Sequence, residues 1–377
     1  MPIRILHLHS SFHAGGKELR AAKLINAFGK GAGHTIVSAV EGATGAGDAI
    51  DPKIAVAYPR EFPSLEGKPL PGRLRRIAQA MAGHDLILTY NWGAMDAVMA
   101  HTVFRDVYRL APLVHHEDGF NAEEANGLRR SRNWFRRIAL GRTSALVVPS
   151  KRLEAIALDA WQQPRARVRR IPNGIGTKAY ARKVKPDALP RVVKRPGEKW
   201  LGTLAGLRAV KNLPRLVRAF AGLPDEWQLV ILGEGPERDA IRDEAVRLDV
   251  GHRVHLPGFV SDPASAVGLF DLFALSSESE QFPVSVLEAM AAGLAVASPD
   301  VGDVADMLAP ENRPYLAPGG DETALSGAIA ALAADEALRN EIGKANRARA
   351  REFYDEKAMI EAYRSVYAGA MKRESFP

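Results

Sequence analysis

The 377-residue sequence contains no cysteine. This absence excludes disulfide bonds, thiolate metal sites and a cysteine nucleophile, and it is typical of proteins from a reducing compartment. No apolar run reaches the roughly 18 residues of a membrane-spanning helix. The start MPIRILHLHS has neither the basic segment nor the long apolar segment of a signal peptide. We therefore expect a cytoplasmic protein.

Recognisable metal-binding patterns are also lacking. The ten histidines are scattered along the chain and have no carboxylate partners at helical spacing. Short repeats and low-complexity tracts are absent as well. The sequence therefore predicts a globular protein that holds neither a metal nor a tightly bound cofactor.

Charge is distributed unevenly between the two halves of the chain. Residues 1–195 contain 32 Lys and Arg against 16 Asp and Glu, a net charge of +16, whereas residues 196–377 contain 19 against 28, a net charge of −9. Opposite signs indicate two modules, of which the first faces an anionic partner. A phospholipid surface, a phosphate-bearing substrate and nucleic acid are the candidate partners.

Short apolar segments alternate with amphipathic segments of helical length along the chain. This alternation predicts parallel sheets with helices on both faces, that is, doubly wound α/β domains. The expected strands are 3–9, 35–40, 85–90, 112–116, 144–149, 200–207, 228–233, 254–256, 272–276 and 295–298. The expected helices are 17–29, 72–82, 93–104, 123–140, 151–160, 212–221, 236–249, 283–292, 322–334, 336–351 and 355–371.

A basic stretch with several prolines, residues 178–198, interrupts the alternation and predicts a linker. We therefore expect one Rossmann-like domain over 1–177 and a second over 199–354. The helix within 355–377 is expected to pack back toward the first domain. Ligands of such sheets bind beyond the carboxyl ends of the strands, so the site is expected in a cleft where the two domains face each other.

A glycine-rich turn follows one strand in each half. Gly15 and Gly16 stand between the first strand and the next helix, where backbone N–H groups and the helix N-terminus can approach a phosphate. The turn Gly233-Glu-Gly235 has Arg238 in place of the third glycine of a dinucleotide fingerprint. We interpret this second turn as a tight turn that opens a helix.

Two glutamates bracket a helix start in the segment from Ser277 to Gly293, SESEQFPVSVLEAMAAG. Pro283 suits the first turn of a helix, and a glycine suits its C-terminal cap. Glu280 then lies in the loop before the helix, and Glu288 lies more than one turn inside it. Carboxylates at these places can accept hydrogen bonds from the vicinal hydroxyls of a ribose and of a sugar beyond the phosphates.

This segment resembles the signature of family 4 glycosyltransferases, which have the GT-B fold and retain the anomeric configuration. Tyr90-Asn-Trp-Gly-Ala94 and Val114-His-His-Glu-Asp-Gly119 resemble in particular the branch of exopolysaccharide-type sugar transferases. Further matches extend the resemblance over nearly the whole chain. They are Gly15-Gly-Lys-Glu18, Arg170-Ile-Pro-Asn-Gly-Ile175, Lys211-Asn212, Leu232-Gly-Glu-Gly-Pro236 and Val301-Gly302.

The resemblance implies a role for each matching residue. Glu288 is expected to hold the donor ribose, Glu280 the hydroxyls of the transferred sugar, and Lys211 the diphosphate. The donor is expected to be a UDP-, GDP- or ADP-sugar bound without a metal, because the chain has no Asp-x-Asp motif and Lys211 with helix N-termini replaces the ion. The remaining donor-binding residues implied are Gly15, Gly16, Phe259, Val260, Phe282, Pro283 and Val284.

Two positions depart from the family pattern. Gly206 stands where the family has a phosphate-binding arginine; Arg208 either substitutes for it or is a solvated surface residue. The family also has an H-x-x-H pattern beside the reacting carbon, in which His115 matches the first histidine and Asp118 replaces the second. His116 is the alternative histidine. Asp118 is expected to accept a sugar hydroxyl or the acceptor's proton, or merely to cap the next helix.

Five arginines occupy the segment Leu128–Leu140 that follows this loop. At helical spacing Leu128, Ser131, Phe135 and Ile138 share one face. A basic amphipathic helix with Trp134 can lie on an anionic membrane; the alternative is a core-facing helix with a solvated basic side. Nucleic acid is disfavoured because no aromatic-laced basic strand surface accompanies the charge. The residues assigned to the membrane or acceptor are Arg129, Arg130, Trp134, Arg136 and Arg137.

The sequence therefore predicts a retaining hexosyltransferase, peripheral on the inner face of the cytoplasmic membrane. Its acceptor is expected to be a lipid-linked sugar, a glycolipid or a polysaccharide. Two alternatives stay open: a sugar-nucleotide epimerase on the same fold, and a non-catalytic sugar-nucleotide-binding protein, which the departures at Gly206 and Asp118 make conceivable.

Overall fold

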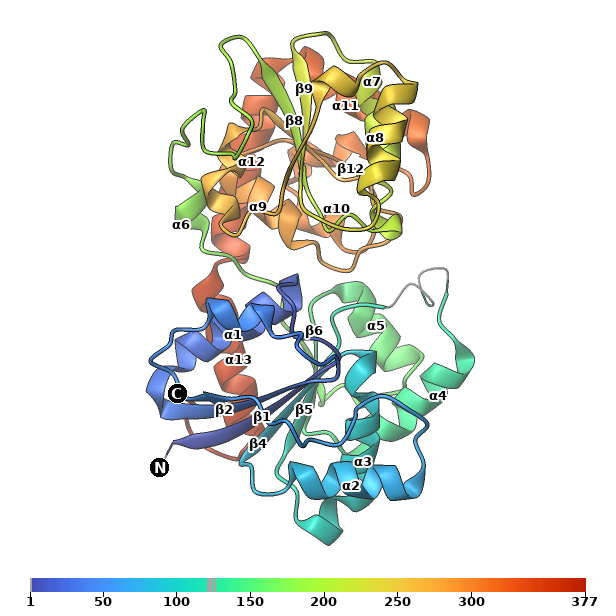
Figure 1. Ribbon diagram of the computed structural model, residues 1–377, viewed down its shortest axis with the longest axis vertical. Helices are drawn as coiled ribbons and strands as arrows, with labels where there is room; N and C mark the ends of the chain where they lie inside the picture. Colours follow the sequence, from blue (N-terminus) through green and yellow to red (C-terminus); the bar gives the residue numbers. More distant parts are fainter. Residues whose placement is uncertain (1, 121–123, 125–126) are drawn as a thin grey trace. The chain divides into compact units, whose positions relative to one another are not determined.

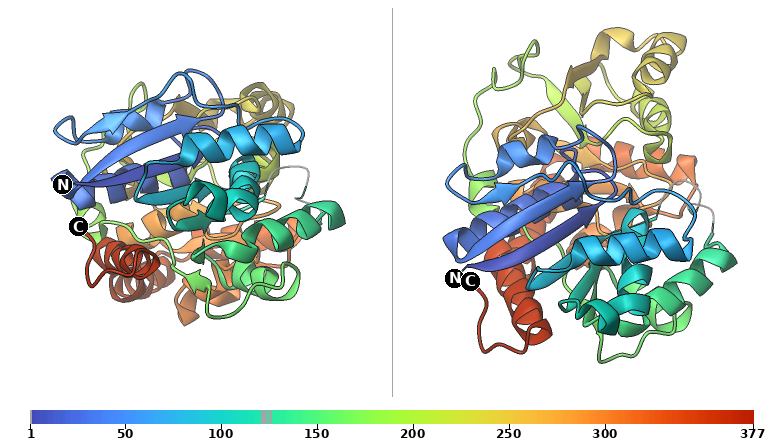
Figure 2. Two further views of the ribbon diagram at one scale, coloured as in Figure 1. Left: turned by 90° about the horizontal axis from the view of Figure 1, so that it is seen from below. Right: turned by 60° about the horizontal axis from the view of Figure 1, so that its bottom comes forward.

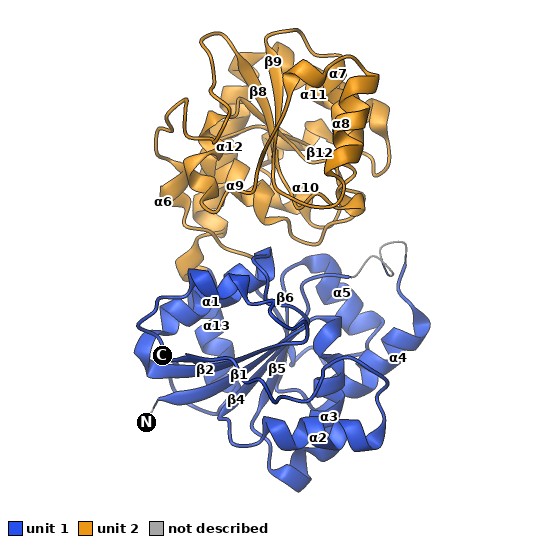
Figure 3. Cartoon of the chain, in the orientation of Figure 1, with its two compact units in different colours: residues 1–172, 359–377 blue, residues 173–358 orange. Residues whose placement is uncertain are grey.

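The computed structural model describes residues 2–120, 124 and 127–377. The chain forms two compact units (Figure 3). Unit 1 comprises residues 1–172 together with 359–377, and unit 2 comprises residues 173–358. Each unit is an α/β domain built on one parallel sheet, as the alternation of apolar and amphipathic segments predicts.

The described strands of unit 1 form a seven-stranded sheet in the order β3-β2-β1-β4-β5-β6-β7. β1 pairs with β2 on one side and with β4 on the other, so the strand order reverses between β1 and β4. All five residues of β4 are buried, which is typical of a strand covered by helices on both faces. The strands are β1 (Ile3–His9), β2 (Ala32–Ser38), β3 (Val56–Ala57), β4 (Leu86–Tyr90), β5 (Leu113–His116), β6 (Ala145–Val148) and β7 (Val168–Arg170).

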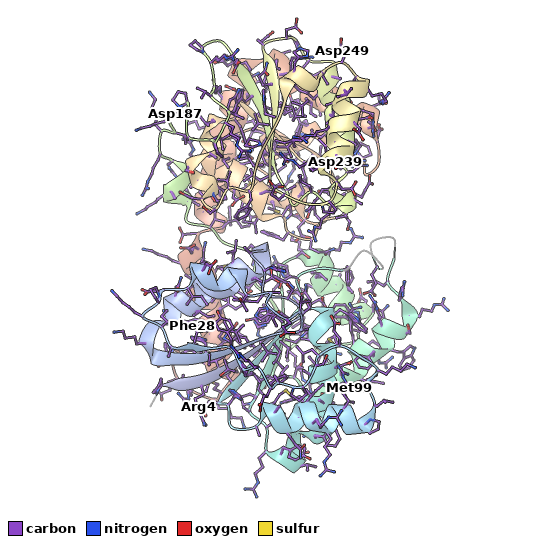
Figure 4. All side chains as sticks on the ribbon, viewed as in Figure 1. Arg4, Phe28, Met99, Asp187, Asp239 and Asp249 are labelled. Carbon is purple, nitrogen blue, oxygen red and sulfur yellow. The ribbon has the colours of Figure 1, made fainter. Side chains whose placement is uncertain are left out.

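Helices cover both faces of this sheet (Figures 1 and 2). α1 (Gly16–Phe28) and α13 (Glu356–Ala370) pack on one face, where the rings of Phe28 and Tyr367 lie 5.9 Å apart. The helices on the other face are α2 (Pro71–Met81), α3 (Met95–Tyr108), α4 (Arg130–Ala139) and α5 (Lys151–Asp159). Phe28 and Met99, labelled in Figure 4, belong to the two separate cores that result.

Unit 2 repeats this plan with six described strands in the order β10-β9-β8-β11-β12-β13. The strand order reverses between β8 and β11. The strands are β8 (Lys199–Leu204), β9 (Trp227–Leu232), β10 (Val254–Gly258), β11 (Leu272–Ala274), β12 (Val296–Pro299) and β13 (Leu316–Ala317). The helices are α6 (Thr177–Tyr180), α7 (Leu213–Ala221), α8 (Arg238–Arg247), α9 (Val284–Ala292), α10 (Val304–Met307), α11 (Glu322–Ala334) and α12 (Glu336–Phe353).

The unit boundaries differ from the expected domain boundaries. Residues 178–198, expected to be a linker, lie within unit 2, where Leu189 is buried in the core. Unit 1 ends at Pro172 and resumes at Met359 inside α13, whose Tyr363 and Tyr367 are buried in the unit 1 core. Proline and charge alone therefore do not mark a free linker, because Leu189, Val192 and Lys194 hold the stretch on unit 2.

Three described strands were not expected from the sequence: β3, β7 and β13, of two or three residues each. Such strands are too short to show a period of two. The expected helix 123–140 also differs, because α4 begins only at Arg130. Residues 123, 125 and 126 of that expected helix lie outside the described residues.

Candidate active site

The carboxyl ends of β8 and β11 carry two charged residues of unit 2. Ligands of open α/β sheets bind where the strand order reverses, which is between these two strands. Lys211 ends the 3₁₀ turn η6 (Ala209–Lys211) after β8, and its ammonium group donates a hydrogen bond to Glu280 in the loop after β11. The Ser277 hydroxyl donates to the same oxygen, Glu280 Oε1, over 2.6 Å. The structure therefore joins Lys211 and Glu280 in one ion pair.

The two loops that hold this pair are bonded to each other. The Lys211 side chain is 15% exposed and that of Glu280 is 10% exposed. The Glu278 N–H donates to the Val210 carbonyl over 2.9 Å, and the Ser276 hydroxyl donates to the Lys211 carbonyl over 2.9 Å. Because these bonds join the loops at several points, the positions of the ammonium and carboxylate groups are fixed by the backbone.

Gly302 allows a third loop to approach Glu280. Its φ of 61° is a left-handed conformation that favours glycine. A Cβ added there would lie 2.5 Å from the Glu280 carbonyl oxygen, and the Asp303 N–H donates to the Gln281 carbonyl over 3.0 Å. The Val301-Gly302 motif thus supports the backbone of the Glu280 loop.

Helix α9 carries Glu288 in its second turn. The expected helix limits are confirmed: Pro283 is the N-cap residue and Gly293, at φ 81°, is the C-cap residue. Glu288 is half-buried and accepts a hydrogen bond of 2.9 Å from the Tyr180 hydroxyl. Among the expected donor residues around this helix start, Phe282 and Pro283 are buried and Val284 is half-buried.

Arg208 lies beside Gly206, the position that departs from the family pattern. Gly206 is exposed, and a Cβ added there would make no contact closer than 3.7 Å, so the position does not require glycine. That nearest atom is Nε of Arg208. Arg208 is exposed, and its guanidinium makes no ion pair with a described residue. Arg208 therefore places a positive charge beside Gly206, and its role as a phosphate partner stays a prediction.

The Gly233–Gly235 turn packs against the backbone of the loop that follows β8. A Cβ added at Gly233 would lie 1.9 Å from the Ala205 carbonyl oxygen, and one added at Gly235 would lie 2.4 Å from the Leu207 carbonyl oxygen. The turn opens α8, as expected, and its glycines permit close backbone packing. The neighbouring Phe259, which follows β10, is 56% exposed, and its expected contact with the nucleobase stays a prediction.

In unit 1, the turn after β1 presents Gly15 and Gly16. Gly15 is the N-cap residue of α1, and a Cβ added at Gly16 would meet no atom within 4 Å. The backbone at Gly16 is therefore accessible, and the N–H groups of the first turn of α1 are suited to an anion.

Asp118, after β5, is tied to Arg20 of α1. The guanidinium donates to both carboxylate oxygens over 2.6 and 2.8 Å, and the Asp118 N–H donates to Asn91 Oδ1 over 2.7 Å. Burial raises the pKa of Asp118, but the charge and hydrogen bonds of Arg20 outweigh it, so this pKa lies below its usual range. Such a carboxylate is a weak proton acceptor. It does not cap α4 either, because the N-cap residue of that helix is Arg129.

His115 and His116 are enclosed within unit 1. Both are buried, and they point to opposite faces of the sheet because neighbouring residues of a strand alternate. His115 Nδ1 lies 2.8 Å from the Thr89 hydroxyl, and His116 Nε2 lies 2.9 Å from the Tyr367 hydroxyl. Burial lowers the pKa of His116 to about 3, so this ring is neutral. The expected catalytic histidines are therefore core residues.

Two family models match consecutive parts of the chain. The model described as "Glycosyltransferase Family 4" matches residues 14–179, and the model described as "Glycosyl transferases group 1" matches residues 185–349. Together these ranges contain the Gly15-Gly16 turn, Asp118, Lys211, Glu280 and Glu288.

The chain belongs to glycosyltransferase family 4.

Curated proteins with similar sequences bear out this family. The glycosyltransferase is 26% identical over 212 residues to an N-acetyl-alpha-D-glucosaminyl L-malate synthase of Bacillus anthracis, a match that covers 56% of each chain. It is 29% identical over 215 residues to a phosphatidyl-myo-inositol mannosyltransferase of Mycobacterium leprae, covering 55% of this chain and 53% of that one. The matches thus span about half the length of these relatives.

A solved structure shows the same fold over nearly the whole chain. The HepE protein of Anabaena, crystallised with UDP and glucose, superimposes with a TM-score of 0.78 at 20% identity and covers 96% of this chain and 98% of its own. The glycosyltransferase has the GT-B fold of two Rossmann-like domains, which confirms the fold class expected from the sequence.

The α4 region corrects one expectation about the glycosyltransferase. Arg136, assigned to a membrane-facing surface, is fully buried and donates to both oxygens of Glu124 over 3.0 and 2.9 Å. Its guanidinium lies 4.8 Å from the Trp92 ring centroid and 5.0 Å from that of Trp161. Helical spacing alone placed this arginine with the surface arginines, whereas its aromatic and acidic partners come from other elements.

The face that Phe135 and Ile138 were expected to share is divided in the structure. Phe135 packs against the core of unit 1, whereas Ile138 is 54% exposed, and Trp134 is 62% exposed. Arg130 and Arg137 are exposed as well, and the Arg137 guanidinium lies 5.1 Å from the Trp134 ring centroid. The outer face of α4 is therefore both apolar and basic.

Sequence analysis missed four polar residues that support these sites: Arg20, Asn173, Tyr180 and Ser277. Each acts through a hydrogen bond to Asp118, the Phe282 carbonyl, Glu288 or Glu280, respectively. Ser277 and Asn173 lie within motifs that carry the family resemblance, but no role was given to them there. Arg20 and Tyr180 bond to residues about a hundred positions away, and no local pattern marks them.

A cavity of about 470 Å³ lies at the amino ends of strands in unit 2, away from the carboxyl ends that carry Lys211 and Glu280. Its lining includes Arg195, Gln228 and His255, at the amino ends of β8, β9 and β10. Within the described residues, no three histidines or acidic side chains gather to hold a metal ion. Among these residues, too, no helix combines the length and the apolar character needed to cross a membrane.

Proposed function

We propose that this protein is a retaining glycosyltransferase that moves a sugar from a nucleotide-sugar donor to a lipid-linked, glycolipid or polysaccharide acceptor. The observation that carries the proposal is the placement of Lys211 and Glu280 at the reversal point of the unit 2 sheet, with Glu288 on the helix that follows. The UDP complex of Anabaena HepE and the lipid acceptor named for the mycobacterial mannosyltransferase support it.

Each donor residue has a chemical task in this proposal. The ion pair of Lys211 with Glu280 balances two partly buried charges. A donor diphosphate beside Lys211 and Arg208 offers these cations a doubly charged partner, which releases Glu280 to accept hydrogen bonds from hydroxyls of the transferred sugar. The Glu288 carboxylate accepts hydrogen bonds from the two ribose hydroxyls. Phe259 and Val260 supply backbone contacts to the base.

The reaction needs no covalent intermediate on the protein. The bond between the anomeric carbon and the diphosphate oxygen breaks, and the acceptor oxygen bonds to that carbon from the same face. The acceptor's proton passes to the departing phosphate oxygen. Positioning and stabilisation of the diphosphate charge by Lys211, Arg208 and backbone N–H groups lower the barrier, so we propose that no metal is required.

Asp118 acts as a fixed anion in this scheme. Its pKa below the usual range and its two hydrogen bonds to Arg20 argue against proton transfer. We propose that Asp118 orients a sugar hydroxyl, while Arg20 keeps the carboxylate ionised and in one orientation.

Replacing Glu288 by alanine tests the nucleotide site. We expect the free energy of binding of the preferred nucleoside diphosphate, chosen among UDP, GDP and ADP, to weaken by about 1.5–3 kcal/mol, the range for a hydrogen bond to a charged group. Isothermal titration calorimetry measures this directly. The control is Glu352→Ala, which removes an exposed carboxylate of the same unit. Equal affinity in Glu288→Ala and the wild type would remove Glu288 from the site.

We further propose that unit 1 binds the inner face of the cytoplasmic membrane through the outer sides of α3 and α4. Val103 and Val107, one turn apart on α3, are 54% and 70% exposed. On α4, Trp134 and Ile138 are likewise exposed and one turn apart, beside the exposed Arg130 and Arg137. Exposed apolar side chains next to basic ones suit an anionic bilayer.

Co-sedimentation with vesicles tests this surface. We expect binding to anionic vesicles, little binding to zwitterionic ones, and release at high salt, since each basic residue near the surface contributes about 1 kcal/mol. Replacing Arg130 and Arg137 by glutamine should reduce binding and leave nucleotide affinity unchanged. The charge-matched control replaces the exposed Arg182 and Lys183 of unit 2. If the protein stays in the supernatant with anionic vesicles at low salt, the outer sides of α3 and α4 do not bind the membrane.

A further inference from the structure

The first eight residues of unit 2, Asn173–Tyr180, are fastened to the donor side of that unit. The Asn173 side-chain amide donates to the Phe282 carbonyl over 3.2 Å, next to the N-cap residue of α9. The Ile175 N–H donates to the Tyr354 carbonyl over 3.0 Å, and the Glu356 N–H donates to the Ile175 carbonyl over 3.1 Å. The segment is therefore held at both ends of its extended part, which fixes where α6 begins.

Tyr180, the last residue of α6, reaches Glu288 from this anchored segment. Its hydroxyl donates to Glu288 Oε1 over 2.9 Å, and its ring packs partly buried against the unit 2 core. Burial and the neighbouring Glu288 charge raise the pKa of Tyr180, so the phenol keeps its proton and remains a donor. Because packing holds the ring in place, the hydroxyl donates to the Glu288 carboxylate from a defined position.

The geometry points to Tyr180 as a positioning residue that orients the Glu288 carboxylate toward the ribose hydroxyls of the donor. This inference rests on the proposed role of Glu288. A glutamate side chain has three rotatable bonds, and a hydrogen bond from a packed ring selects among its orientations. A carboxylate has about four lone-pair sites, and the bond from Tyr180 occupies one of them.

The alternative is that the Tyr180 hydroxyl competes with the ribose for the Glu288 carboxylate. It predicts the opposite change in nucleotide affinity when the hydroxyl is removed. If Tyr180 occupied an acceptor site that the ribose needs, then removing its hydroxyl would tighten nucleotide binding. If Tyr180 orients the carboxylate, removing the hydroxyl weakens binding, and it does so solely for ligands that carry the ribose hydroxyls.

The test compares Tyr180→Phe with the wild type, using the nucleoside diphosphate that binds most tightly among UDP, GDP and ADP, and its 2′,3′-dideoxy form. We expect Tyr180→Phe to raise the dissociation constant of the ribonucleotide about tenfold, a common size for coupling within one hydrogen-bond network. The dissociation constant of the dideoxy form should stay within about twofold, because that ligand lacks the hydroxyls that Glu288 binds.

The matched control is Tyr315→Phe in the same unit, since the Tyr315 hydroxyl makes no hydrogen bond to a described residue. Tyr180→Phe should also have no further effect in a Glu288→Ala background. Three results for Tyr180→Phe would each overturn the positioning role. They are an equal loss of affinity for both nucleotides, tighter binding of the ribonucleotide, and an unchanged dissociation constant of the ribonucleotide. If Glu288→Ala itself leaves ribonucleotide binding unchanged, the proposed donor site fails first, and the two failures are distinguished.

Discussion

Replacing Arg136 by methionine is expected to lower the free energy of unfolding of unit 1 by about 3–5 kcal/mol, the usual cost of removing one partner of a buried ion pair. Arg136 is the buried partner of Glu124 through two hydrogen bonds, and its Nε lies 3.4 Å from the buried Glu117 carboxylate. Methionine fills much of the volume but removes the guanidinium beside Glu117 and leaves Glu124 with its weaker contact to Arg132, of 3.3 Å. Urea unfolding, followed by tryptophan fluorescence, measures the loss, because Trp92 and Trp161 stack on the guanidinium.

Arg137→Met is the matched control for this result. Arg137 is the next residue of α4 and is exposed, so the same chemical change there should shift stability by no more than about 0.5 kcal/mol. A loss at Arg136 as small as the one at Arg137 would mean that Glu117 and Glu124 find other partners or become protonated.

Replacing Lys211 by alanine should lower turnover by roughly 100-fold or more, because the departing diphosphate loses its main cation. The measurement is release of nucleoside diphosphate from the preferred nucleotide-sugar in the presence of acceptor. The exposed Lys344 provides the control, and Lys344→Ala should retain the wild-type rate. The loss should fall mainly on kcat, since the interaction strengthens as charge develops on the leaving group.

The variant Arg208→Ala tests whether Arg208 shares the binding of the diphosphate with Lys211. A loss comparable to that of Lys211→Ala would show that Arg208 replaces the arginine missing at Gly206. A wild-type rate would leave Lys211 and backbone donors as the whole phosphate site. Should nucleotide-sugar bind while the wild-type protein transfers no sugar to any acceptor, the non-catalytic alternative would stand in place of the enzyme.

Local sequence patterns predicted the fold and the limits of the helix that carries Glu288 well. Alternation gave both parallel sheets, and the proline and glycine around α9 gave its limits, because these signals act within a few residues. The same patterns placed Lys211 and Glu280 in separate loops, and the family resemblance implied separate roles for them. Their direct ion pair depends on β8 and β11 being neighbours in the sheet, which periodicity does not show.

The unit 1 residues were harder to predict because their surroundings come from distant segments. His115 and His116 lie in the last part of a strand, where motif matching suggested a ligand site, yet burial by α13 and other elements makes them core residues. Asp118 was recognised, but its partner Arg20 lies 98 residues earlier. Arg136 is one of five arginines in its segment, and no local pattern distinguishes the buried one from the exposed ones.

The path of the chain has a consequence for the order of folding during synthesis. Unit 2 is one continuous stretch, whereas the core of unit 1 is completed by Tyr363, Tyr367 and Phe376 near the C-terminus. A ribosome delivers the chain from its N-terminus, and domains generally fold as they emerge. The segment that covers Phe28 and His116 therefore becomes available to unit 1 only after unit 2 has been made. The domain whose synthesis starts first is the one whose chain is completed last.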